Sequence, residues 1–123
     1  MTLESLSVSE LKVMNFIWNS DRELSSKEIT ETFEKSDGTT KATTMTFLRR
    51  LEKKGYINSE KIGRNTNYKI KITREHYINS SFKYFVDEMH NGSIKDFLES
   101  LIKSGALSDE EIEKLIDSLK KNI

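Results

Sequence analysis

The sequence predicts a mainly α-helical fold with one small β-hairpin, in the form of a winged helix-turn-helix unit followed by a helical segment. Two observations predict this fold class. Three stretches with helical periodicity come before one stretch of alternating apolar and basic residues, and helical periodicity then returns until the chain ends. Three helices and a hairpin within about 65 residues form the layout of a winged helix. We therefore expect one domain over residues 1–72 and a second over residues 73–123.

The first two helices are marked by capping signals. Two S-x-x-E capping boxes, Ser7 with Glu10 and Ser25 with Glu28, predict helices over about residues 8–19 and from about residue 25 onward. Apolar residues follow each box at helical spacing, so each helix is expected to pack through one face. These apolar residues are Leu11, Met14, Ile17 and Trp18 in the first helix, and Ile29 and Phe33 in the second.

A third helix is predicted between two glycines. Thr39 or Thr40 can act as its N-cap after the turn at 35–38, and the helix is expected to run to Lys54. Gly55 then supplies the left-handed residue that commonly ends a helix.

After Gly55 the periodicity changes to two. Residues 56–62 and 68–72 are predicted as strands, because in the second run positions 68, 70 and 72 are apolar while 69 and 71 are basic. The connector 63–67 is rich in Gly and Asn, which favours a β-hairpin. Two strands alone are not stable in water, so the hairpin is expected to pack on the helices.

Three further helices are predicted after Thr73. One covers about residues 74–90, one begins at the cap Ser93 and ends before Gly105, and the last opens at a third capping box, Ser108 with Glu111. About 50 residues cannot bury all their apolar stripes within one copy, so this segment is expected to form a homodimer. The expected dimerisation residues are Phe82, Phe85, Met89, Phe97, Leu101, Ile112, Leu115 and Leu119.

Charge is distributed unevenly along a chain whose net charge is zero. Residues 38–71 hold nine basic and two acidic residues, a net charge of +7, whereas 1–37 carry −4 and 72–123 carry −3. A charge run is usually only a solvated face. Here the basic block coincides with the third helix and the hairpin, which a winged helix presents to DNA.

The outward stripe of the third helix carries Thr43, Thr46, Arg50 and Lys53 and has no acidic residue. Arginine pairs with guanine edges, threonine offers a hydroxyl and a methyl group, and lysine meets phosphate, so double-stranded DNA is the expected partner. An ordinary solvated helix is the alternative, but such helices usually include Glu for i, i+4 pairs. Arg64 on the hairpin connector is expected to contact the backbone or minor groove. The full expected DNA-binding set is Thr40, Lys41, Thr43, Thr46, Arg49, Arg50, Lys53, Lys54 and Arg64.

Other function classes find little support in the sequence. The absence of cysteine excludes disulfides, thiolate nucleophiles and cysteine–zinc sites. His76 and His90 are predicted on one helix, about 21 Å apart, too far to share a metal. No nucleotide-binding or nucleophile motif is present. We expect no catalytic residues, metal or cofactor. Without a membrane-spanning or secretory segment, we expect a cytoplasmic protein.

Three segments of the sequence match a set of family motifs. Residues 43–56 fit T-x-x-T-x-L-x-R-L-x-K-K-G-aromatic, 10–18 fit E-x-x-V-M-x-x-[IVL]-W, and 107–112 fit L-S-x-[DE]-E-I. With these motifs the chain resembles the penicillinase repressors of the BlaI/MecI type. The resemblance implies a dimeric repressor of β-lactamase or related resistance genes, with Thr43, Thr46 and Arg50 as reading residues.

The resemblance also implies relief of repression when a membrane sensor triggers cleavage in the dimerisation segment. Family members often carry an Asn-Phe bond where this chain has Ser100-Leu101, so the chain departs from the family at the expected cleavage position. Copper-responsive relatives carry a C-terminal cysteine motif, which this chain lacks. The alternative function is a winged helix that serves as a protein-interaction module without sequence-specific DNA binding.

Overall fold

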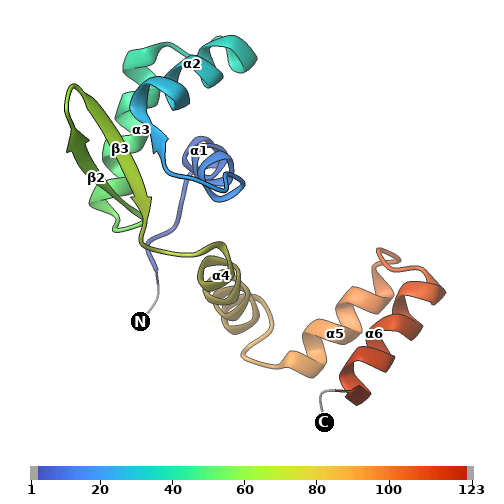
Figure 1. The fold of residues 1–123 in the computed structure, drawn as a ribbon. Coiled ribbons are helices and arrows are strands. Elements are labelled where there is room, and N and C mark those ends of the chain that lie inside the picture. Colours follow the sequence, from blue (N-terminus) through green and yellow to red (C-terminus); the bar gives the residue numbers. More distant parts are fainter. Residues whose placement is uncertain (1–2, 122–123) are drawn as a thin grey trace. The chain divides into compact units, whose positions relative to one another are not determined.

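The computed structural model describes residues 3–121, apart from the side chain of Leu119. Its elements are α1 (Val8–Trp18), β1 (Leu24–Ser25), α2 (Ser26–Asp37), α3 (Lys41–Lys53), β2 (Ile57–Ile62), β3 (Asn65–Ile70), α4 (Arg74–Met89), α5 (Ile94–Lys103) and α6 (Asp109–Lys121) (Figure 1). The chain divides into two compact units, one ending at Asn79 and the other beginning at Ser80. This division lies within α4, whereas the expected domain boundary lies just before that helix.

The helix starts follow the predicted capping signals. In α1 the Ser7 hydroxyl accepts from the Glu10 amide at 3.1 Å, and the Glu10 carboxylate accepts from the Ser7 amide at 2.8 Å. The same reciprocal pair is present between Ser25 and Glu28 at the start of α2. Thr40 caps α3 by accepting from the Thr43 amide at 3.2 Å. These local signals confirm the predicted order of helices, since each cap satisfies amides that have no partner inside the helix.

The sheet differs in two ways from the predicted hairpin. It has three antiparallel strands in the order β1-β3-β2, because Leu24 and Ser25 pair with Tyr68 and Asn67. The prediction of 68–72 as the second strand was wrong: β3 runs from Asn65 to Ile70. Asn65, Thr66 and Asn67 extend the ladder because backbone pairing with β2 satisfies their polar groups.

The turn between β2 and β3 is therefore only two residues long. Gly63 has a positive φ of 66°, a conformation that a two-residue hairpin needs and that glycine adopts without strain. Past β3, the Lys71 and Ile72 amides donate to the Tyr56 carbonyl at 2.9 and 3.2 Å, so the chain stays attached to the start of β2 after the sheet ends.

The first unit has a continuous core between its three helices and the sheet. Leu48 and Leu51 on α3 and Ile29 on α2 have no exposed surface. The core residues are Val13, Met14, Ile17, Leu24, Ile29, Phe33, Leu48, Leu51, Tyr56, Ile57 and Tyr68. Burial of this inward face leaves the opposite face of α3 toward solvent, as the helical wheel predicts.

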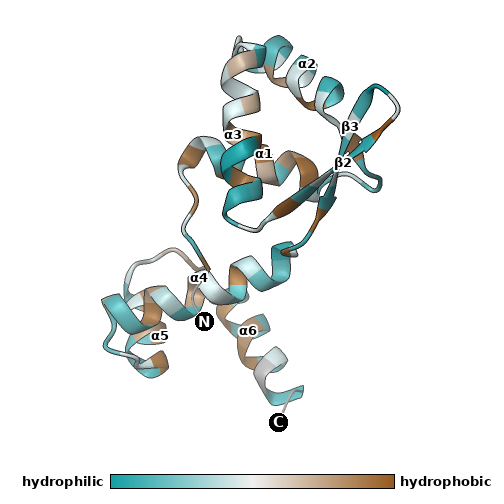
Figure 2. Cartoon of the chain, turned by 90° about the vertical axis from the view of Figure 1, so that its left-hand side faces the viewer, coloured by the Kyte–Doolittle hydropathy of each residue, from teal (hydrophilic) through white to brown (hydrophobic). Residues whose placement is uncertain are grey.

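The second unit is built from the rest of α4, α5 and α6. Its aromatic cluster joins Phe97 to Phe82, Phe85 and His90 at centroid distances of 5.1, 5.8 and 5.5 Å, each pair close to perpendicular. His90 Nδ1 lies 2.7 Å from Asp96 Oδ2. Hydropathy colouring shows apolar and polar residues alternating along α5 and α6, as expected for amphipathic helices (Figure 2).

Candidate nucleic-acid interface

The outer face of α3 is polar and cationic. Thr43, Arg49, Arg50 and Lys53 are exposed and Thr46 is half-buried, while Thr44 on the inward face is fully buried. The face is positioned by the buried side of the same helix, so its geometry depends on the core and not on contacts of its own. Within the described residues, the side chains of Arg50 and Lys53 have no hydrogen bond or ion pair. Both cations are therefore available to an anionic ligand.

The threonine hydroxyls on this face are ordered by local hydrogen bonds. The Thr40 hydroxyl donates to the Thr43 hydroxyl at 2.9 Å, and the Thr46 hydroxyl donates to the Ala42 carbonyl at 3.1 Å. An Arg49 guanidinium nitrogen lies 3.4 Å from the Thr46 hydroxyl, which accepts from it. These contacts hold short polar groups in place on the exposed face without using an acidic side chain.

Glu52, the acidic residue of α3, is occupied by the hairpin. Its Oε1 atom accepts from the Ser59 amide at 2.8 Å and from the Ser59 hydroxyl at 2.6 Å. This contact joins β2 to α3 and holds the carboxylate at Ser59. The partner of Glu52 lies seven residues later, beyond the turn at Gly55, so helical periodicity alone does not indicate it.

Lys54 has a role that differs from the expected one. Its Nζ atom lies 2.6 Å from Glu10 Oε1 and 2.9 Å from the Ser5 carbonyl, and the Glu10 side chain is only 2% exposed. Burial acts to raise the pKa of Glu10, but the hydrogen bonds from Lys54 and Ser7 outweigh it and leave that pKa below its ordinary value. The Lys54 ammonium therefore neutralises a buried carboxylate, and we leave it out of the candidate interface.

The tip of the hairpin and the start of α3 face a common hollow. Its volume is about 440 Å³, and Lys41, Arg64 and Lys27 contribute cations to it. The other lining residues are Ser26, Thr30, Glu31, Glu34 and Asn65. Lys41 and Arg64, predicted separately from the sequence, are thus brought together. Lys27 was not predicted, because nothing in the local sequence indicates that the first turn of α2 lies beside the hairpin tip.

One hairpin lysine is paired within the sheet. Lys69 Nζ lies 3.1 Å from Glu60 Oε2, and this hydrogen bond raises the pKa of Lys69. Lys61, in contrast, has no such partner among the described residues. The free cations of the hairpin therefore gather toward its tip, beside Arg64.

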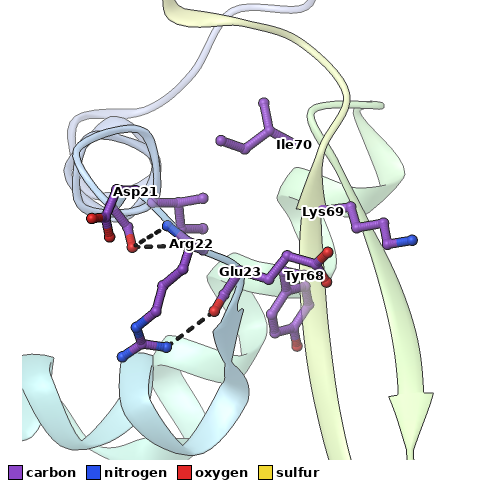
Figure 3. A pocket seen from close by; sticks show the side chains of 8 residues that line it. Asp21, Arg22, Glu23, Tyr68, Lys69 and Ile70 are labelled. Atoms are coloured by element: carbon purple, nitrogen blue, oxygen red, sulfur yellow. Dashed lines mark hydrogen bonds between the residues drawn. The ribbon is translucent and has the colours of Figure 1, made fainter.

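A second hollow of about 290 Å³ lies between the loop after α1 and strand β3 (Figure 3). Asp21, Arg22 and Glu23 line it on the loop side, and Tyr68, Lys69 and Ile70 line it on β3. It mixes both charge signs and carries no obvious ligand chemistry. Across the described part of the chain, no group of three or more His, Asp or Glu residues could hold a metal ion.

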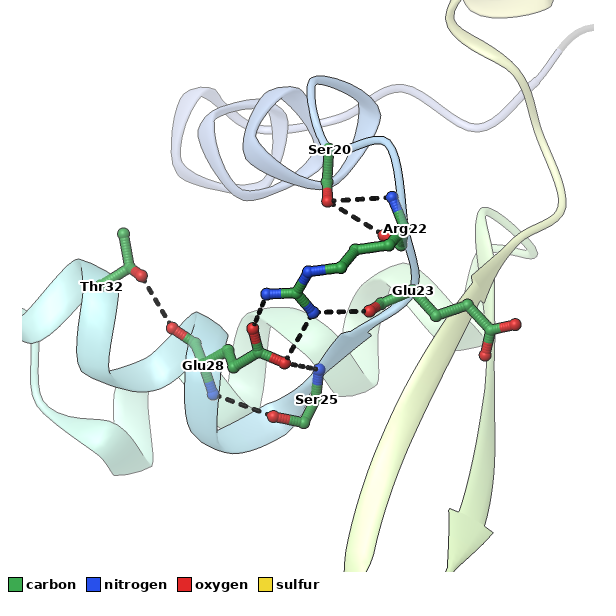
Figure 4. A network of polar contacts seen from close by, with 6 residues as sticks. All are labelled: Ser20, Arg22, Glu23, Ser25, Glu28 and Thr32. Atoms are coloured by element: carbon green, nitrogen blue, oxygen red, sulfur yellow. Dashed lines mark hydrogen bonds and ion pairs between the residues drawn. The ribbon is translucent and has the colours of Figure 1, made fainter.

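A polar network holds the loop before α2 in place (Figure 4). The Arg22 guanidinium contacts both carboxylate oxygens of Glu28 and donates to the Glu23 carbonyl at 3.1 Å. The hydrogen bond from Arg22 lowers the pKa of Glu28 to about 2. Because Glu28 also completes the capping box with Ser25, the network fixes β1, which in turn pairs with β3.

The second unit exposes much of the surface that the sequence assigns to dimerisation. Phe82 and Phe85 are 42% and 43% exposed and Met89 is 67% exposed. Leu115 is also exposed, whereas Phe97, Leu101 and Ile112 are half-buried. Leu119 lies outside the described side chains.

The expected cleavage position lies inside a helix. Ser100 is exposed and Leu101 half-buried, and both belong to α5. No helix among residues 3–121 is both long and apolar enough to cross a membrane.

Comparison with known proteins gives one consistent result. A family model described as penicillinase repressor matches residues 6–121. The penicillinase repressor of Bacillus licheniformis is 29% identical over 120 residues, which cover 98% of this chain and 93% of that protein. The methicillin resistance regulatory protein MecI of Staphylococcus aureus (strain N315) is 27% identical over 94% of both chains.

Two solved structures match the first unit's winged-helix fold. The DNA-binding domain of the repressor BlaI is 32% identical, has a TM-score of 0.56, and covers 63% of this chain and 94% of its own. The Bacillus licheniformis BlaI monomeric form in complex with the blaP half-operator is also 32% identical, with a TM-score of 0.53, covering 62% of this chain and 92% of its own. The winged helix-turn-helix fold that the sequence predicts is thereby confirmed.

Proposed function

We propose that this chain, which belongs to the penicillinase repressor family, is a dimeric, sequence-specific DNA-binding repressor of β-lactamase or related antibiotic-resistance genes. The observation that carries the proposal is the outer face of α3, where threonines and unpaired cations are exposed and the acidic residue Glu52 is held by Ser59. A protein-interaction module would not require a face free of negative charge.

The polar residues of this face have distinct chemical roles in the proposed complex. Arg50 reads a guanine through paired hydrogen bonds, and Thr43 and Thr46 contact base edges in the major groove. Lys53 and Arg49 contact phosphate, as do Thr40 and Lys41 at the start of the helix. Arg64 meets the backbone or the minor groove from the hairpin tip, and Lys27 extends this phosphate contact across the shared hollow.

A second copy of the chain is the proposed occupant of the apolar surface of the second unit. Phe82, Phe85 and Met89 lie exposed on α4, and an isolated soluble chain gains stability when such a patch is covered. A two-fold dimer presents two α3 helices to a two-fold-related operator. The BlaI structure in which a monomeric form binds a half-operator supports one chain for each half-site.

Induction is proposed to act on the link between the two copies. Bivalent binding raises affinity by roughly 10²–10⁴, and a single cut in the dimerisation segment removes this gain without touching α3. A membrane sensor pathway with a protease would have to open α5 locally to reach the bond between Ser100 and Leu101. Immunoblotting before and after β-lactam exposure tests this step: a repressor that stays full length while its target genes switch on would rule cleavage out.

DNA binding by the full chain tests the main proposal. We would measure affinity for a blaP operator duplex and a random duplex over a range of salt concentrations. The Arg50→Ala variant should lose about 1–3 kcal/mol of binding free energy on the operator duplex only. Lys53→Ala should weaken binding to both duplexes and reduce the slope of log affinity against log salt concentration by about one. Lys103→Ala, on α5, is the matched control. Equal losses on both duplexes for Arg50→Ala would contradict α3 as the reading element.

A further inference from the structure

The segment that follows the sheet is tied firmly to the first unit. The Trp18 indole N–H, at the end of α1, donates to the Ile72 carbonyl at 2.9 Å. The Tyr56 carbonyl accepts from the Lys71 and Ile72 amides. Ile72 is thus held from two sides just before α4 begins, by the end of α1 and by the residue that precedes β2.

The first turn of α4 continues this attachment with side chains. The Tyr77 ring lies 5.5 Å from the Trp18 ring and 5.8 Å from the Tyr56 ring, between centroids. The Arg74 guanidinium lies 5.7 Å from the centre of the Trp18 ring and donates to Asn19 Oδ1 at 2.5 Å. Cation–π and tilted aromatic contacts of this kind are directional, so they restrain rotation as well as separation.

We propose that Arg74 and Tyr77 are positioning residues that fix the direction in which α4 leaves the first unit, and thereby set the half-site spacing that a dimer accepts. This inference rests on the proposed function as a dimeric DNA-binding protein. It concerns which operators are bound and not how one α3 helix reads one half-site.

The length of α4 makes its direction important. Its 16 residues span about 24 Å at 1.5 Å per residue. A tilt of about 10° at the first turn therefore moves the far end by about 4 Å, which exceeds the rise of about 3.4 Å per base pair along the axis of a DNA duplex. The helix contains no glycine and the chain no proline, so α4 has none of the residues that commonly kink a helix.

Arg74 and Tyr77 are suited to positioning because they are only partly buried. Tyr77 packs at the edge of the core that contains the fully buried Leu48 and Leu51, and Arg74 is not part of that core. Removal of the Arg74 guanidinium leaves that core and the reading face intact. A residue with a purely structural role would instead lower half-site and full-site binding together.

The test uses full-length protein and duplexes built from the half-site that the wild type enriches from a randomised pool. Affinity is measured for one half-site and for two inverted half-sites whose spacing changes in single base-pair steps. We compare the wild type with Arg74→Ala, Tyr77→Leu and the double variant. The control is His76→Ala, an exposed residue on the same turn whose side chain has no hydrogen bond or ion pair among the described residues.

For the wild type, a change of one base pair from the preferred spacing should lower the affinity at least about tenfold, because part of the gain from bivalent binding is lost. In the double variant this penalty should fall below about threefold, while the half-site affinity stays within about twofold of the wild type. An unchanged spacing preference, or an equal loss on half-site and full site, would overturn the inference alone. A wild type that binds duplexes without any spacing preference would also overturn the inference. A wild type that binds no duplex would overturn both the inference and the proposed function.

Discussion

The two units of the chain bury their apolar side chains to different extents. The first unit closes a core in which Leu48, Leu51 and Ile29 are completely buried. The second unit buries Val86 but leaves 42% of Phe82, 43% of Phe85 and 67% of Met89 exposed. Buried apolar area is the main source of folding stability. The comparison therefore teaches that the first unit can be stabilised by its own core, whereas the second unit has apolar surface that the proposed dimer would cover.

The largest effect is expected from a cavity in the first unit. Leu51→Ala should lower the free energy of unfolding by about 2–5 kcal/mol, because it removes a completely buried side chain from a packed core. Urea unfolding followed by the fluorescence of Trp18, the chain's one tryptophan, measures it in the first unit. A loss below about 1 kcal/mol would show that this core is not closely packed.

A somewhat smaller loss is expected when the buried ion pair is broken. Lys54→Met leaves Glu10 buried without its cation, which should cost about 2–3 kcal/mol at pH 7, since Lys54 itself is partly exposed. The folded-state pKa of Glu10 lies below its ordinary value, so the stability from this pair exists above pH 4.5 and is lost as the pH falls through that lowered pKa.

Two variants serve as controls for this ion pair. Lys53→Met removes a neighbouring lysine that is exposed and unpaired within the described residues, and it should change the stability by less than about 0.5 kcal/mol. The double variant Glu10→Gln, Lys54→Met should regain part of the stability, because no buried charge is left. Equal losses for Lys53→Met and Lys54→Met at pH 7 would count against the ion pair.

In the second unit the same kind of truncation should act on assembly. Phe85→Ala should weaken dimerisation by about threefold to tenfold, because full burial of a phenylalanine contributes about 1.5–3 kcal/mol and 43% of this residue is still exposed in the single chain. The urea unfolding of the first unit should barely change. Sedimentation equilibrium measures the effect, with Lys83→Ala as the control on the same helix. A wild type that is monomeric at micromolar concentration would contradict the proposal that a second copy covers the apolar surface of the second unit.

The smallest effect concerns the exposed network around Glu28. Its carboxyl should titrate at a pKa of about 2 in the wild type. In Arg22→Ala the pKa should rise but stay below its ordinary value, because the hydrogen bonds with Ser25 remain. Carbon-detected NMR of the side-chain carboxyls follows this shift directly. Because the pair is exposed, the stability of the first unit should depend on it only slightly. An unshifted pKa in the wild type would show that Arg22 does not hold Glu28 in solution.

The local parts of this fold could be predicted from the sequence. The pairs Ser7 with Glu10 and Ser25 with Glu28 mark helix starts because each cap lies three residues from its partner. Strand β1 could not be predicted in this way: it has two residues, and its pairing partner Tyr68 is far along the chain. Residues 65–67 are Asn, Thr and Asn, which are typical of turns, and only pairing across the sheet makes them a strand.

In the candidate interface, too, local residues could be predicted from the sequence and residues placed by tertiary packing could not. The outward face of α3 follows from helical periodicity, so Thr43, Arg50 and Lys53 could be named in advance. Lys54 could not be separated from them, because its partner Glu10 lies 44 positions earlier in the sequence. The same holds for Lys27, which joins Arg64 only through the packing of α2 beside the hairpin.

The outer face of α3 also affects how such a protein diverges. Arg50 and Lys53 make no side-chain hydrogen bond or ion pair in the described fold, and the hydroxyls of Thr43 and Thr46 bond only within α3 or its cap. Surface substitutions of this kind usually change stability by less than about 0.5 kcal/mol. Mutations there are thus free to accumulate while the fold persists. After a gene duplication, two copies could acquire separate target sequences through a few exchanges on one helix, with the buried side of that helix unchanged.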